Sequence, residues 1–237
     1  MKIPKAVLFD LDDTLLDGSW LQIVINETCR VLAGRLALGL PQLAETNQRV
    51  WLEYWPTVEA QWELAVDGSF VMPEVWRRTL KACGCEDDSA VRLACETHAQ
   101  LIPKARRLFD DVEGLLVALK RAGLLLGLVT NGASNVQRDK LQGLGLASAF
   151  DAIAISGETG ARKPAVAAFA PVLEKMSVGP DCVWHVGDNL AADVAGAKAA
   201  GLVAIWINRN GRVRQETDPT PDLEIQSLSE MAAILRC

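Results

Sequence analysis

Short apolar runs alternate with helical segments in the second half of the chain. From about residue 106 onwards, a segment with helical spacing repeatedly ends on glycine and an apolar run follows, as in LLVALKRAG before LLLGLVTNG and LAADVAGAKAAG before LVAIWINRNG. Helices that end on glycine and alternate with almost continuously apolar strands are typical of βαβ units around a buried parallel sheet. The pattern predicts a doubly wound, Rossmann-like α/β core.

The region after the first predicted strand has a different pattern. SWLQIVINETCRVLAGRLALGL has the spacing of an amphipathic helix, Pro41 is well placed to begin a second helix, and Pro56 should kink or divide that helix. Further helices are expected near residues 73–83 and 87–101, and no strand of the core type occurs there. The predicted boundaries are residues 17–103 for an all-helical cap domain and residues 1–16 and 104–237 for the core.

Charge and composition limit the classes of partner. The 237 residues carry 24 lysines and arginines against 30 aspartates and glutamates, a net charge of -6, and 50% of them are hydrophobic. This composition supplies a large core but no basic surface for a nucleic acid polymer or an anionic membrane, whereas a small phosphorylated metabolite remains a compatible partner. No apolar run approaches the roughly eighteen residues of a membrane span. We expect a soluble, cytoplasmic protein.

The six cysteines are scattered along a chain long enough to fold without disulfides, so reduced thiols are expected. Cys83 and Cys85 suggest a metal or redox pair, but a second pair at zinc-site spacing is missing from the sequence, which has two histidines. The other cysteines are Cys29, Cys95, Cys182 and Cys237.

The first predicted strand ends in a group of acids. In VLFDLDDTLLDG, an apolar run is followed by Asp10, Asp12 and Asp13. Carboxylates this close repel one another, and removing them from water is costly unless a cation or a proton shares the site. Because a strand end does not require adjacent acids, we interpret Asp10 and Asp12 as functional residues.

Three further polar clusters follow predicted strands or begin helices. They are VTNG with Thr130 and Asn131, RKP with Lys163, and GDNLAAD with Asp188 and Asp193. Ligands of parallel α/β sheets gather at the carboxyl ends of the strands, so these side chains are expected near one another. Each cluster alone also fits an ordinary turn, helix start or helix cap.

Taken together and in this order, DLDDT, VTNG, RKP and GDNLAAD resemble the motifs of the haloacid dehalogenase-like (HAD) hydrolase superfamily. The resemblance is to subfamily I, in which a helical C1 cap follows the first motif. It implies that Asp10 is the nucleophile that becomes an aspartyl phosphate, and that Asp12 protonates the leaving oxygen and then activates water. It also implies Mg²⁺ as the cofactor, held by Asp10, the backbone carbonyl of Asp12, and Asp188.

The same resemblance implies the roles of the remaining residues. Thr130, Asn131 and Lys163 are expected to bind the phosphoryl oxygens, and Lys163 also offsets the charge of the nucleophile. Asp193 is expected to support Lys163 or to reach the metal through water.

Two positions depart from the common pattern of the superfamily. Asp13 stands where many relatives have glycine, and we expect it to cap the turn after the strand. Ala192 stands where relatives often have asparagine, which removes a possible hydrogen bond near the metal and bears on metal affinity.

Asp12 bears on the choice of reaction. Dehalogenases lack an acid at this position because a halide needs no proton to leave, whereas the alkoxide of a phosphate ester does. We therefore predict a phosphohydrolase, similar to phosphatases of nucleotides, sugar phosphates or acylneuraminate phosphate. A phosphomutase also keeps this acid and stays open, and a 2-haloacid dehalogenase is the weaker alternative. A non-enzymatic phospho-acceptor module of the response-regulator type is much shorter and has no helical insertion.

Tryptophans are concentrated in the predicted cap. Trp51, Trp55, Val58 and Trp62 share one helical face if the helix continues through Pro56. We favour packing inside the cap as the role of this stripe. A wall over the substrate and a dimer face are the alternatives, which leaves monomer and homodimer both open.

Overall fold

The protein, described over residues 3–235 by a computed structural model, is built on one six-stranded sheet. The strands are β1 (Ala6–Phe9), β2 (Leu125–Thr130), β3 (Ala152–Ile155), β4 (Val183–Gly187), β5 (Val203–Ile207) and β6 (Leu223–Ile225). All pair in parallel in the order β3-β2-β1-β4-β5-β6, which confirms the predicted doubly wound α/β core. The order reverses between β1 and β4, so ligands are expected at the carboxyl ends of these two strands.

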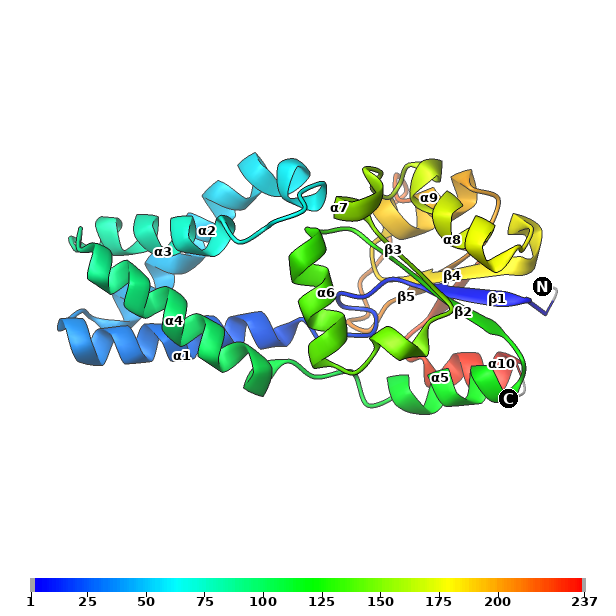
Figure 1. Cartoon of the computed structure of the whole chain (residues 1–237), viewed down its shortest axis with the longest axis horizontal. Helices are drawn as coiled ribbons and strands as arrows, with labels where there is room; N and C mark the ends of the chain where they lie inside the picture. The colour runs from blue at the N-terminus through cyan, green and yellow to red at the C-terminus, as the bar shows by residue number, and fades with distance from the viewer. Residues whose placement is uncertain (1–2, 236–237) are drawn as a thin grey trace.

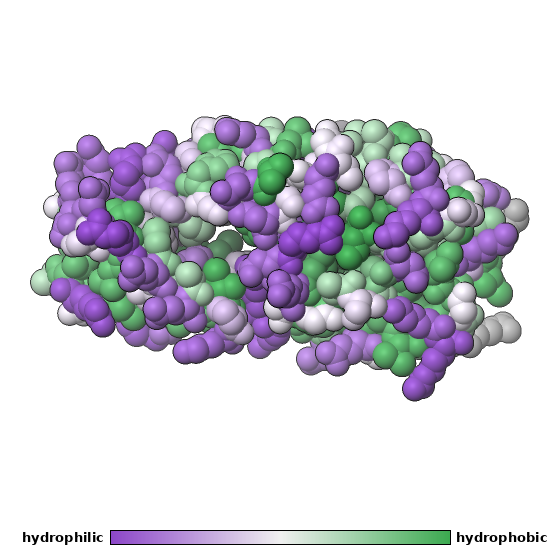
Figure 2. All heavy atoms as spheres, viewed as in Figure 1, coloured by the Kyte–Doolittle hydropathy of each residue, from purple (hydrophilic) through white to green (hydrophobic). Residues whose placement is uncertain are grey.

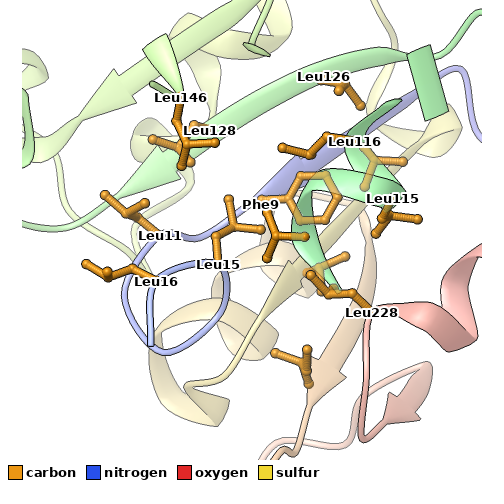
Figure 3. Close-up of a cluster of buried hydrophobic side chains, with 14 of the residues drawn as sticks. Phe9, Leu11, Leu15, Leu16, Leu115, Leu116, Leu126, Leu128, Leu146 and Leu228 are labelled. Atoms are coloured by element: carbon orange, nitrogen blue, oxygen red, sulfur yellow. The ribbon is translucent and has the colours of Figure 1, made fainter. Parts of the chain in front are cut away.

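Helices cover both faces of the sheet (Figure 1). They are α5 (Val112–Arg121) and α10 (Ser229–Leu235) on one face, and α8 (Ala170–Met176) and α9 (Ala195–Ala199) on the other. Successive strand side chains point to opposite faces. Phe9 packs among leucines that include Leu115 (Figure 3). Leu8, on the opposite face, packs in a cluster with Val172. The continuous apolar run of β1 therefore reflects burial on both faces.

The cap lies to one side of the sheet and consists of four helices that follow β1 (Figure 1). They are α1 (Ser19–Leu36), α2 (Leu40–Glu63), α3 (Val71–Ala82) and α4 (Asp88–Ala105). Helix α4 packs against α1 and α3, and α2 packs against α3, around a core that includes Ile25, Leu43 and Trp76. The all-helical insertion is confirmed, and its boundaries at residues 17 and 103 stay predictions.

Pro56 lies inside α2 without dividing it. Pro41 is in the first turn of this helix, as predicted. A proline inside a helix removes a backbone hydrogen bond and costs about 3 kcal/mol. Val50 and Tyr54 before Pro56 and Trp62 after it pack in one apolar cluster with α3, and this packing offsets the cost. The division allowed by the sequence does not occur.

Shorter elements connect the strands. They are α6 (Ser134–Gly143), α7 (Ser156–Thr159), the 3₁₀ segments η1 (Ala147–Ala149), η2 (Val166–Ala168) and η3 (Pro180–Cys182), and the π-helical turn η4 (Leu190–Val194). Single π-helical turns are frequent at functional sites. Here η4 directly follows the carboxyl end of β4.

The loop after α2 ties the cap to α6. The backbone N–H groups of Ser134 and Asn135 donate to the carbonyl oxygens of Ala65 (2.9 Å) and Val66 (3.0 Å). The backbone N–H of Gly68 donates to Asn135 Oδ1 at 2.9 Å. Figure 2 shows the surface hollowed between the cap and the core, so the two parts meet around a recess.

Two further expectations concern thiols and membranes. Five cysteines are free thiols, as predicted, and Cys237 lies outside the described residues. Within residues 3–235, no helix has the length and apolarity needed to cross a membrane.

Candidate active site

Three of the predicted site acids converge where the strand order reverses. Asp10 follows β1, and its backbone N–H donates to the carbonyl of Val186 in β4 at 2.9 Å. Asp188 follows β4, and Asp193 lies in η4. One carboxylate oxygen of each acid lies within 4.8 Å of the others. The fold therefore brings together acids that are far apart in the sequence.

The buried ammonium of Lys163 bridges two of these acids. Its Nζ donates to Asp10 Oδ1 and to Asp193 Oδ1, both at 2.6 Å. His185 Nε2 also lies 2.9 Å from Asp193 Oδ1, and the backbone N–H of Asn189 donates to Asp193 Oδ2 at 3.1 Å. Burial opposes the charge of Lys163, but Asp10 and Asp193 raise its pKa above the ordinary value. These contacts favour the protonated form of Lys163.

One lysine does not offset all of the negative charge. Burial raises the pKa of Asp10, although the charge of Lys163 opposes this rise. Burial, followed by the charges of Asp10 and Asp193, raises the pKa of Asp188 to about 8. Burial acts in the same direction on Asp193, but Lys163 and His185 lower its pKa below the ordinary value. Asp10 and Asp188 thus form a site that favours a proton or a cation.

The chemistry of this donor set fits Mg²⁺. The ion prefers carboxylate and carbonyl oxygens, and the cluster supplies carboxylate oxygens. Both oxygens of Asp193 already take part in hydrogen bonds. Asp10 uses one oxygen for Lys163 and the carboxylate of Asp188 uses none among the described residues, so these two acids have the oxygens best placed to hold a metal ion. The backbone carbonyl of Asp12 as a third protein ligand stays a prediction.

Asn131 forms two hydrogen bonds with the backbone of Lys163. Its Oδ1 accepts from the backbone N–H of Lys163 at 2.8 Å, and its Nδ2 donates to the carbonyl of Lys163 at 3.0 Å. Thr130 ends β2, and its buried hydroxyl accepts from Gln137 Nε2 at 2.7 Å. The roles of Thr130 and Asn131 as phosphate ligands stay predictions.

Glu63, the last residue of α2, brings the cap to the same loop. Its carboxylate pairs with Arg162 and accepts from Asn131 Nδ2 at 3.1 Å. Its backbone carbonyl accepts from the hydroxyl of Ser156. Sequence reasoning missed Glu63, because an acid at the end of an amphipathic helix has no distinguishing spacing.

The side chain of Asp12 lies against α6, in contact with two buried residues that sequence reasoning also missed. Lys140 Nζ donates to Asp12 Oδ1 at 2.7 Å and to Oδ2 at 2.8 Å. Gln137 Nε2 donates to Asp12 Oδ2 at 3.0 Å. Gln137 and Lys140 share a helical face with the buried Leu141, and polar residues at core spacing were the available signal.

Asp12 and Asp13 have opposite environments. Burial would raise the pKa of Asp12, but the charge and hydrogen bonds of Lys140, with the Gln137 amide, lower it below the ordinary value. Asp13 has a φ of 57°, in the left-handed region where glycine is most relaxed and aspartate is tolerated. Its Oδ1 accepts from the backbone N–H of Gly18 at 3.2 Å, which confirms the predicted turn-capping role.

The tryptophan stripe packs within the cap. The rings of Trp51 and Trp55 stack with centroids 5.2 Å apart, and Trp62 meets Trp55 edge-on at 5.2 Å. All three are partly buried against a cluster that includes Val71 and Val75. The rings therefore pack within the cap, as predicted. Their partial exposure leaves the other two predicted roles, a wall over the substrate and a dimer face, open.

Comparison with known proteins agrees with this geometry. Residues 4–201 match the haloacid dehalogenase-like hydrolase family. The phosphoserine phosphatase of Thermus thermophilus is 35% identical over 96% of this chain and 97% of that protein. The structure of the putative HAD-hydrolase YfnB from Bacillus subtilis, bound to magnesium, has a TM-score of 0.70 at 28% identity and covers 100% of both chains.

A 2-haloacid dehalogenase from Pseudomonas syringae is also similar, with a TM-score of 0.66 at 29% identity over 99% of both chains. The family therefore spans more than one reaction, and the fold does not choose between them. With the family match over residues 4–201 and the helical insertion after β1, the chain belongs to the haloacid dehalogenase-like hydrolases.

Proposed function

We propose that the protein is a magnesium-dependent phosphatase that hydrolyses a small phosphorylated metabolite through an aspartyl phosphate on Asp10. The observation that carries this proposal is a second acid, Asp12, two residues after the nucleophile and held by its own basic partner, Lys140. The leaving oxygen of an ester needs a proton, whereas a halide does not. Similarity to a phosphoserine phosphatase supports this reaction class, and Asp12 argues against the dehalogenase reaction.

In the first step, a carboxylate oxygen of Asp10 attacks the phosphorus atom. The bond between phosphorus and the leaving oxygen breaks, and Asp12, which takes up a proton when the phosphate dianion binds beside it, gives that proton to this oxygen. Lys163, 2.6 Å from Asp10 Oδ1, orients the nucleophile and offsets negative charge, and Thr130 and Asn131 contact the phosphoryl oxygens. Asp10, Asp188 and the Asp12 carbonyl would hold Mg²⁺, which would supply positive charge to offset that of the phosphoryl group.

In the second step, Asp12 is a carboxylate and takes a proton from a water molecule that attacks the same phosphorus atom. The bond between phosphorus and the Asp10 oxygen breaks, which releases inorganic phosphate and restores both acids. Asp193 keeps Lys163 in place during both steps through its 2.6 Å hydrogen bond.

The proposal is tested by phosphate release from p-nitrophenyl phosphate in the presence of Mg²⁺. We expect many turnovers per protein molecule. Labelling that stops at one phosphoryl group per chain would instead indicate a phospho-acceptor module. Halide release from 2-chloropropionate without phosphatase activity would indicate a dehalogenase, and conversion between isomeric sugar phosphates would indicate a phosphomutase.

To identify the natural substrate, a panel of phosphorylated metabolites should be compared by kcat/KM. The panel should include nucleotides, sugar phosphates, phosphoserine and an acylneuraminate phosphate. A compound whose kcat/KM exceeds that of the others by at least about tenfold would identify the substrate class. This factor equals about 1.4 kcal/mol of transition-state binding.

A further inference from the structure

Two polar side chains of α6 are buried at positions where a helix ordinarily presents apolar residues to the core. Gln137 is fully buried, and Lys140 is 5% exposed. Burying an ammonium group is costly unless it is paired and hydrogen-bonded. Lys140 is paired with Asp12, and its ammonium donates to both oxygens of that carboxylate. Through this ion pair, Lys140 of α6 directly contacts the carboxylate of Asp12.

The contacts restrain both oxygens of Asp12. The ammonium of Lys140 lies 2.7 Å from Oδ1 and 2.8 Å from Oδ2, and the Gln137 amide donates to Oδ2 at 3.0 Å. A carboxylate held by three hydrogen bonds from two side chains cannot rotate freely about its Cβ–Cγ bond. Its orientation is thus set by α6.

Gln137 also joins Asp12 to the end of β2. Its Nε2 lies 2.7 Å from Thr130 Oγ1 and 3.1 Å from the carbonyl oxygen of Asn131, in addition to Asp12 Oδ2. An amide nitrogen has two hydrogens, so three acceptors share them. One buried amide therefore fixes the distance between the second acid and the residues expected to contact the phosphoryl group.

We propose that Lys140 and Gln137 are positioning residues for Asp12, which aim its carboxyl group at the leaving oxygen and then at water. This inference rests on the proposed phosphatase function. It assigns the two buried lysines to separate acids, because Lys163 contacts Asp10 and Asp193, whereas Lys140 contacts Asp12. Loss of Lys140 should consequently impair proton transfer more than phosphate binding.

The test compares phenyl phosphate with p-nitrophenyl phosphate in single-turnover measurements. Phenoxide is a more basic leaving group than p-nitrophenoxide, so its departure depends more on the proton from Asp12. In Lys140→Met, release of phenol should slow by about 10²-fold, the size of loss expected from a misplaced catalytic group. Release of p-nitrophenol should slow clearly less, and the KM for both substrates should stay near the wild-type value.

Two further variants separate positioning from folding. Gln137→Met should show the same dependence on the leaving group with a smaller loss. Lys140→Arg keeps a cation at the position and should recover part of the phenol rate. Lys120→Met removes an exposed lysine from α5 and should match the wild-type protein with both substrates.

Equal slowing with both leaving groups, or wild-type phenol release in Lys140→Met, would overturn the positioning role. The same result in Lys140→Arg and Lys140→Met, with wild-type circular dichroism, would also overturn it. Absence of turnover in the wild-type protein with Mg²⁺ and either substrate would instead reject the proposed function itself.

Discussion

The two sides of the site each contain a buried lysine, but the lysines have different surroundings. On the β4 side, Lys163 bridges Asp10 and Asp193 within a crowded acidic cluster. On the α6 side, Lys140 binds both oxygens of the single acid Asp12. Crowding leaves excess negative charge on the first side, whereas the second side is balanced and its acid has a lowered pKa. The same residue type thus compensates charge in one place and fixes orientation in the other.

The largest effect is expected from the nucleophile on the crowded side. Asp10→Asn should reduce turnover of p-nitrophenyl phosphate by more than about 10⁴-fold, because an amide is a poor nucleophile. Asp13→Asn is the matched control, since it changes a nearby acid that caps a turn, and it should retain most of the activity. Activity of Asp10→Asn near that of Asp13→Asn would refute covalent catalysis by Asp10.

Metal removal should act on the crowded side as well. EDTA should abolish turnover and Mg²⁺ should restore it, because Lys163 offsets only part of the acidic charge. Activity that persists after exhaustive chelation would contradict the metal assignment.

The pH dependence of stability gives a second readout of the same metal site. Asp188 has a folded-state pKa of about 8, above an unfolded value near 4. The folded state therefore binds its proton more tightly, and Asp188 lowers stability as pH rises between these values. Mg²⁺ removes this loss, so the increase in Tm caused by Mg²⁺ should grow from about pH 5 to about pH 8. An increase that stays constant over this range would argue against binding at Asp188.

Replacement of Lys163 tests whether its role differs from that of Lys140. Lys163→Met should reduce kcat by about 10²- to 10³-fold, the loss typical of a removed electrostatic contact. The first step should slow by similar factors with phenyl phosphate and p-nitrophenyl phosphate, because Lys163 contacts the nucleophile. A rise in KM with unchanged kcat would show that Lys163 contributes only uniform binding.

The smallest effect is expected at the contact between cap and core. The Arg162 side of the Glu63 pair is 44% exposed, and partly exposed pairs contribute about 1 kcal/mol or less. Glu63→Gln should therefore lower kcat/KM by less than about tenfold. Glu59→Gln, an exposed position one helical turn earlier, should leave kcat/KM unchanged. A loss of more than about 10²-fold would show that Glu63 acts in the chemistry.

The two sides also differ in how far the sequence predicts them. Asp10 and Asp188 directly follow strands, and Lys163 and Asp193 lie in short motifs within the segments that follow strands. Parallel strands bring such motifs together at one edge of the sheet. Lys140 follows Asp12 by 128 positions, and its ion pair exists only in the folded chain. The helical spacing of Gln137 and Lys140 with Leu141 indicates a shared face. A helix with exposed lysine and glutamine has the same spacing, so the burial of these two residues and their pairing with Asp12 depend on tertiary contacts that the spacing does not identify.

The sheet and the cap also differ in how far the sequence predicts their structure. The apolar runs predicted the parallel core, because strands that are buried on both faces of a sheet require apolar residues at almost every position. Within the cap, the sequence did not determine whether Pro56 divides α2, since packing on both sides of the proline decides the outcome.

The central claim, a phosphoryl group on Asp10, is tested most directly by mass spectrometry of quenched Asp12→Ala protein. Asp12→Ala lacks the proposed base for the second step, so the intermediate should accumulate after a burst of p-nitrophenol that equals the protein concentration. We predict one added phosphoryl group per chain, located on the peptide that contains Asp10, and none in the double variant with Asp10→Asn. A burst without added mass, or a phosphoryl group on another residue, would contradict the account.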